Sequence, residues 1–221
     1  MRTLLTYRNF IQRIVLLAGI GAAATGALRA QSTEFNLEGQ PVQVHGFLSQ
    51  GFAYSRGNNY LTMNSNSGSL AFTDFGANVS TQVTDKLRVG AQIYDRNIGQ
   101  LTQWRPELDW ANIDYRFRDW LGIRAGKIKT VMGLHNDTQD MEFLHPWAIL
   151  PQSIYPLDLR VSTIAHTGAD IYGDIGLKRF GGVSYTVYAG KAPFDRYGGY
   201  VYGQECNGIN VTSYSARYEG A

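Results

Sequence analysis

Five residues whose side chains can bind metals or transfer protons fall within eleven positions of the chain. They are His135, Asp137, Asp140, Glu142 and His145, in the segment HNDTQDMEFLH. Imidazole and carboxylate groups suit divalent metals. The usual helical zinc motif, however, places its histidines four positions apart, and these two are ten apart. We expect no metal and no cofactor here, and a metal site stays open as a minor alternative.

Other chemistry finds little support in the chain. The G-x-S-x-G motif of serine hydrolases is absent, and no Ser-His-Asp set can be chosen from single residues. Cys206 is the only cysteine, which excludes a disulfide within the chain and a cysteine-built zinc site. We therefore expect no enzymatic activity, with an outer-membrane enzyme kept as a second alternative.

The first thirty residues are typical of an export signal. Arg2, Arg8 and Arg13 precede an apolar run at 14–28, and Ala30 comes before the polar QSTEFN. A basic head, a short apolar body and a small residue at the cleavage point predict a signal peptide over 1–30. The apolar run is shorter than the roughly 20 residues of a membrane-spanning helix. The mature domain is then 31–221, outside the cytoplasm.

Cleavage changes the charge of the protein. The chain has 20 basic and 18 acidic residues, and segment 1–30 holds four arginines and no acid, which leaves a net charge of −2. Nucleic-acid binding needs a clustered basic face, so we expect no nucleic-acid partner. Export without disulfides favours the envelope of a Gram-negative cell.

Apolar and polar residues alternate from residue 42 to residue 218. In one run, Leu87, Val89 and Ile93 alternate with Arg88 and Gln92. A period of two predicts strands with one apolar and one polar face. About eight such runs are legible, and the fold class that we expect is all-β. Trp110 has the parity of the polar positions, which indicates a register irregularity in its strand.

The connections alternate between short and long. Tight turns are expected at 84–86 and 118–120, and long links elsewhere. This arrangement is typical of an antiparallel up-and-down transmembrane β-barrel. A soluble exported β-sandwich or barrel that binds a carbohydrate-like ligand gives similar alternation and is the first alternative. Several arginines on the polar face and aromatic residues at strand ends favour the membrane barrel.

The acidic segment follows the fifth strand, in a long connection at 128–166. Connections of this length usually have a function. The strings RAGKIKTVMGLHNDTQD, ILPQSIYPLDLR and TGADIYG resemble the phosphate-selective porin O and P family and related porin-like proteins. The resemblance implies a trimeric porin of 16 or 18 strands, with this loop folded into the pore as a constriction. The chain would then be the N-terminal half of a larger barrel.

On this hypothesis the protein is an outer-membrane porin for passive diffusion of small hydrophilic solutes or ions, including anions such as phosphate. Its partners are outer-membrane lipid, the solutes and two further copies of itself. Acids on the loop face arginines on the barrel wall and set up a field across the gap. In the alternative interpretation, these arginines pair with wall acids such as Asp114 and Asp170 and have only a structural role. The candidate pore-lining residues are Arg88, Arg96, Arg116, Arg124, Lys127, Lys129, Asp137, Asp140 and Glu142.

Overall fold

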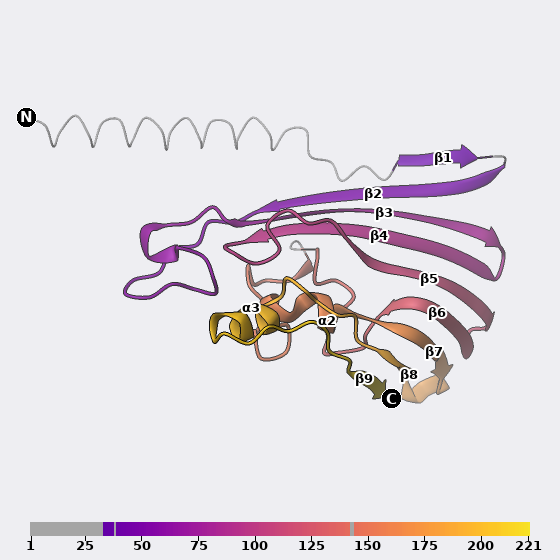
Figure 1. The fold of residues 1–221 in the computed structure, drawn as a ribbon. Coiled ribbons are helices and arrows are strands. Elements are labelled where there is room, and N and C mark those ends of the chain that lie inside the picture. The colour runs from indigo at the N-terminus through magenta and orange to yellow at the C-terminus, as the bar shows by residue number, and fades with distance from the viewer. Residues whose placement is uncertain (1–32, 38, 142–143) are drawn as a thin grey trace, which may run out of the picture. The chain divides into compact units, whose positions relative to one another are not determined.

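The computed structural model describes residues 33–37, 39–141 and 144–221. In this part of the chain, nine strands form one antiparallel sheet in which each strand is hydrogen-bonded to the next in chain order (Figure 1). The all-β, up-and-down antiparallel fold is thereby confirmed. The strands are β1 (Thr33–Leu37), β2 (Gln40–Gln50), β3 (Phe72–Thr84), β4 (Leu87–Ile98), β5 (Glu107–Arg118), β6 (Leu121–Lys129), β7 (Ala165–Gly176), β8 (Gly182–Lys191) and β9 (Arg217–Gly220).

In the described part of the chain, the helical segments are short and lie in the connections. Among the described residues, no helix combines the length and apolar character needed to cross a membrane. The predicted signal peptide, 1–30, lies outside the described residues. The helical segments are η1 (Ser65–Ser67), η3 (Leu157–Leu159), α2 (Arg160–Ile164), η4 (Lys178–Phe180) and α3 (Gly199–Cys206).

The additional strand relative to the eight predicted is β1. It has five residues, TEFNL, and is antiparallel to β2 with Phe35 opposite Val42. Five residues show too few alternations to be recognised as a strand from the sequence. Its place next to β2 is fixed by hydrogen bonds that the residue pattern does not reveal.

The sheet has tight turns at one end and long connections at the other. Residues 85–86 join β3 to β4, and 119–120 join β5 to β6, as predicted. In the first turn, the Thr84 hydroxyl accepts a hydrogen bond from the Leu87 N–H at 3.1 Å. The longest connection is 130–164. It is shorter than the predicted 128–166 because β6 and β7 each extend two residues into the segment predicted as a loop. We call residues 130–164 the long loop.

The two faces of the sheet differ in character. One row of opposed residues crosses β4 to β8 and is apolar: Leu87, Tyr115, Ile123, Ile171 and Val187. The adjacent row is polar and belongs to the other face: Arg88, Asp114, Arg124, Asp170 and Tyr188. Alternate side chains of a strand point to opposite faces. We therefore name the two sides the apolar face and the polar face.

A β-bulge interrupts the pairing of β4 with β5. Gln92 is opposite Trp110 and Ile93 is opposite Leu108, so Asp109 is the extra residue. The register irregularity predicted at Trp110 is confirmed. A bulge redirects a side chain that regular pairing would place differently, and the Asp109 side chain is buried.

Candidate functional site

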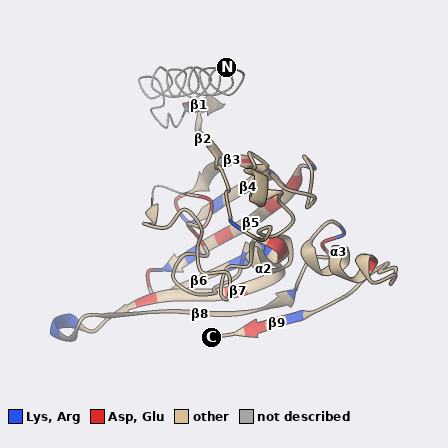
Figure 2. Ribbon diagram, turned by 90° about the vertical axis from the view of Figure 1, so that its left-hand side faces the viewer, with Lys and Arg blue, Asp and Glu red and all other residues tan. Residues whose placement is uncertain are grey.

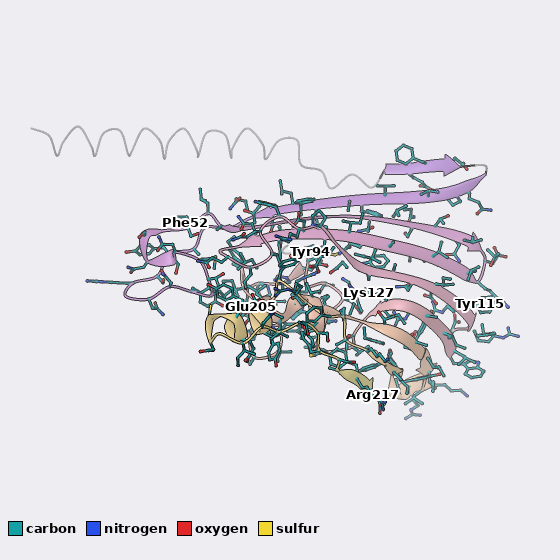
Figure 3. All side chains as sticks on the ribbon, in the orientation of Figure 1. Phe52, Tyr94, Tyr115, Lys127, Glu205 and Arg217 are labelled. Carbon is teal, nitrogen blue, oxygen red and sulfur yellow. The ribbon has the colours of Figure 1, made fainter. Side chains whose placement is uncertain are left out.

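The long loop packs on the polar face of the sheet (Figure 1). Its short helix, α2, begins at Arg160, whose guanidinium carbon lies 3.7 Å from the centre of the Tyr94 ring. Tyr94 comes from the middle of the sheet, where the long loop meets β4 (Figure 3). The arginine therefore fixes the end of the loop to β4.

Arg160 is the centre of a buried network of charges. Its Nη1 and Nη2 atoms contact the two carboxylate oxygens of Asp109 at 2.5 and 3.2 Å, and Nη2 also binds Asp140. The Gln92 amide donates hydrogen bonds to Asp109 at 2.8 Å and to Asp140 at 3.0 Å. Lys129 Nζ lies 3.5 Å from Asp140. We call these five residues the Arg160 cluster.

The charges of the cluster support one another. Burial alone would raise the pKa of the Asp140 carboxyl, but the positive charges of Arg160 and Lys129 hold it below its ordinary value. Burial would likewise lower the pKa of Arg160, and Asp109 and Asp140 raise it well above its ordinary value. Both residues therefore stay ionised at neutral pH, and the pairing of Arg160 with Asp109 of β5 joins the loop to the sheet.

The low pKa of Asp140 makes the attachment of the loop sensitive to acid. A carboxyl with a lowered pKa stabilises the folded state above its unfolded pKa of about 3.9, and that contribution is lost as the pH falls through the folded value. We expect the thermal midpoint of the wild type to fall on acidification below about pH 4. Asp140→Asn should lower the midpoint at pH 7 and reduce its dependence on acid.

The matched control for this prediction is Asp137→Asn. Asp137 is exposed, and the described residues give its carboxylate no hydrogen bond. This variant should keep the wild-type acid dependence, as measured by circular dichroism during heating. Equal acid dependence in Asp140→Asn and the wild type would contradict the assignment.

Hydrogen bonds also hold the two ends of the long loop together. The buried Asn136 amide donates one hydrogen bond to the carbonyl oxygen of Thr130 and another, at 3.0 Å, to that of Ile164. Thr130 is the first residue of the loop and Ile164 is its last. The Tyr155 hydroxyl accepts a hydrogen bond from the His135 N–H at 2.7 Å. A Cβ at Gly133 would lie 2.2 Å from that hydroxyl, and Gly133 has a φ of +65°. Glycine is therefore required at this close approach.

Among the described residues of segment 135–145, the histidines and acids do not gather into a metal site. The rings of His135 and His145 are edge to face, 5.8 Å apart, and His145 Nδ1 lies 2.9 Å from the Trp147 carbonyl oxygen. Over the described residues, no three His, Cys, Asp or Glu side chains are grouped as metal ligands. Glu142 lies outside the described residues. Asp140 belongs to the Arg160 cluster instead.

Two of the predicted wall arginines form ion pairs with wall acids. Arg124 Nη2 lies 2.7 Å from the buried Asp170, and Arg116 Nη2 lies 3.3 Å from Asp174. Arg88 donates a hydrogen bond to Ser80 at 3.0 Å and forms no ion pair within the described chain. These arginines are not a block of positive charge, because acids are interleaved with them (Figure 2).

The other predicted cations lie closer to the connections. Arg96 is buried and donates a hydrogen bond to the Leu157 carbonyl oxygen of the long loop. Lys127 donates to the Leu108 carbonyl oxygen at 2.5 Å, and Lys129 to that of Asp137 at 2.8 Å. These three residues fasten segments together, a role that the sequence prediction did not assign to them.

Asp137 and Asp140 have different environments. Asp140 binds Arg160 directly, whereas the exposed Asp137 carboxylate acts on Arg124 through space. No ion pair joins Asp137 to Arg124 in the described structure. The charge of Asp140 is therefore neutralised by its ion pair. Asp137 keeps an exposed negative charge that acts on Arg124 from a distance.

Sequence reasoning missed Arg160 and Asp109. Arg160 is the last residue of ILPQSIYPLDLR, a string with no other basic residue. Its partner is 51 residues away, on another element. The available sign of Arg160 in the sequence was an arginine that follows an apolar segment. The available sign of Asp109 was the register irregularity at its neighbour Trp110.

A cavity of about 300 Å³ lies between the long loop and strands β2 to β4. We call it the loop–wall cavity. On the wall side it is lined by Ser49, Phe72, Asp74, Tyr94 and Ile98, and on the loop side by Gln139, Asp140, His145, Ile149, Leu150, Leu157 and Arg160, among others. It combines apolar surface with a few charged groups, as binding sites for small molecules do.

No protein-family model, curated protein or solved structure matches the chain. The resemblance to the porin O and P family therefore stays a prediction.

Proposed function

We propose that this sheet is part of the wall of an outer-membrane porin and that the long loop narrows its pore. In this proposal the apolar face meets lipid and the polar face meets water. Small hydrophilic solutes or ions pass by passive diffusion through the part of the pore that the loop leaves open. Residues 1–30 would direct export to the envelope.

The distribution of exposed and buried side chains carries the proposal. On the apolar face, large side chains are exposed: Leu48 is 74% exposed and Ile113 is 56% exposed. On the polar side, Asp170 is 2% exposed and Arg160 is 1% exposed. A soluble β-sandwich buries its apolar face and exposes its polar one. The opposite arrangement is that of a membrane barrel.

The long loop adds a constriction to this wall. Membrane β-proteins commonly fill or plug the barrel interior with a loop, and charged side chains at a narrow place rank ions and solutes. Here the Arg160 cluster fixes the loop on the polar face. Arg88, Arg124 and Asp137 supply charge beside it.

The test is reconstitution of the purified protein in planar lipid bilayers. A porin should need detergent for solubility and should give discrete conductance steps. An exported soluble binding protein would stay in solution without detergent and give none. The absence of steps from protein with a heat-sensitive gel mobility, a mark of a folded barrel, would contradict the proposal.

Arg88→Glu tests the charge of the polar face. Arg88 has no ion-pair partner in the described residues, and only Ser80 loses a hydrogen bond. We expect a loss of stability of about 1 kcal/mol, because the new carboxylate lies opposite Asp114 on β5 and like charges across a sheet repel. The reversal potential in a salt gradient should shift toward cations, because negative lining charge favours cations. The control is Arg179→Glu, at the tight-turn end, which should shift the potential less. An equal shift in both variants would exclude a local effect of Arg88.

A further inference from the structure

We propose that the loop–wall cavity binds a small primary amine with an apolar group, and that the Asp74 carboxylate is its anchor. As a solute site this rests on the proposed function, whereas binding itself can be measured without any conductance.

Asp74 has no cationic partner in the described part of the chain. Arg96 is directly opposite it on β4, which is the position of an ion-pair partner. The Arg96 guanidinium, however, extends to the Leu157 carbonyl oxygen of the long loop. Arg160, the arginine that lines the cavity, is bound by Asp109 and Asp140. Asp74 is left with neutral donors only.

Two neutral donors hold the Asp74 carboxylate in place. The Ser49 hydroxyl donates to Oδ1, and the Tyr94 hydroxyl donates to Oδ2 at 2.9 Å. A carboxylate has about four acceptor positions, so room for further donors remains. A partly buried carboxylate is unfavourable without a counter-ion. The cavity therefore presents an oriented negative charge that a cationic ligand would neutralise.

The geometry favours an ammonium group over a guanidinium. A guanidinium binds best when both carboxylate oxygens accept parallel hydrogen bonds. Here Ser49 occupies one oxygen and Tyr94 the other. An ammonium is compact and has three rotatable donors, so it fits beside these hydroxyls.

The remaining surface suits an apolar group. Phe72 and Ile98 come from the wall, and Ile149, Leu150 and Leu157 come from the loop. A volume of about 300 Å³ is at the small end of ligand pockets. A single ring or a short alkyl chain attached to the amine matches this size.

The experiment measures benzylamine binding to the purified protein in detergent micelles by isothermal titration calorimetry. Benzyl alcohol, similar in shape and neutral, is the second probe. We expect benzylamine to bind more tightly, and Asp74→Asn to weaken it at least about tenfold, as expected for a lost charge-assisted hydrogen bond. Benzyl alcohol should be unaffected. The matched control is Asp119→Asn, a carboxylate that is 95% exposed in a turn, and it should bind like the wild type.

Equal binding of the two probes, or unchanged benzylamine affinity in Asp74→Asn, would overturn the inference. Should Asp74→Asn fail to fold, Ala148→Trp decides, because Ala148 lines the cavity and a larger side chain fills it. Loss of benzylamine binding in that variant supports the site, and full retention overturns it.

The same protein in bilayers separates this inference from the proposed function. Benzylamine binding without conductance would support the site and overturn the porin. Conductance without benzylamine binding would support the porin and overturn the site.

Discussion

Arg160→Met should release the long loop from the wall and destabilise the protein by about 3–5 kcal/mol, the usual effect of removing one partner of a buried ion pair. The variant leaves Asp109 and Asp140 buried without their shared cation. It also removes the stacking on Tyr94. Limited proteolysis should then cleave within 130–164, and the mean conductance step should increase. Chemical unfolding in detergent measures the loss of stability.

Two variants make this prediction specific. Arg116→Met removes an arginine whose ion pair with Asp174 is solvent-exposed, and such pairs contribute at most about 1 kcal/mol. Adding Asp109→Asn to Arg160→Met should recover part of the stability, because one buried unpaired charge is removed. Wild-type resistance to proteolysis in Arg160→Met would contradict the role of the Arg160 cluster in holding the loop.

Arg124→Glu should have the second largest effect, again about 3–5 kcal/mol. Asp170 is buried, and Arg124 Nη2 lies 2.7 Å from it. The substitution replaces this attraction by repulsion between two carboxylates on neighbouring strands. The midpoint of chemical unfolding should fall, and the yield of folded protein should decrease.

Arg124→Glu combined with Asp170→Arg is the control. It restores an ion pair with its charges exchanged, at the same opposed positions of β6 and β7. Recovery of the unfolding midpoint in the double variant would assign the effect to the pair. If Arg124→Glu alone were as stable as the wild type, the ion pair would not contribute to folding.

The sheet could be predicted because its information is local. Leu87 to Ile93 shows the period of two within a single strand, and the other long strands repeat this pattern. The tight turns follow from short polar breaks in the pattern. Even the bulge left a sign, since Trp110 occupies a polar position. The short β1 was missed because five residues give too little periodicity.

The candidate site depends on contacts between distant residues, and these could not be predicted. The acids of segment 135–145 were predicted to face the arginines of the strands, yet Asp140 is held by Arg160 of its own loop and by Gln92, 20 and 48 residues away. Arg96 looked equivalent to Arg88 and Arg124 by parity. Which arginine is buried depends on where the long loop lies, and strand periodicity has no information on the path of a loop.

The polar row Arg88, Asp114, Arg124 and Asp170 has a consequence for long-range electrostatics. Neighbouring strands are about 4.8 Å apart, so positive and negative charges alternate at that spacing. The potentials of alternating charges cancel at distances beyond their spacing, unlike those of charges of one sign. In the proposed porin, a solute away from the polar face would therefore feel little net field, and one in contact with that face would feel a strong one. Such a surface sorts solutes by the arrangement of their own charges, so that a zwitterion would interact with it more strongly than a simple ion of the same size.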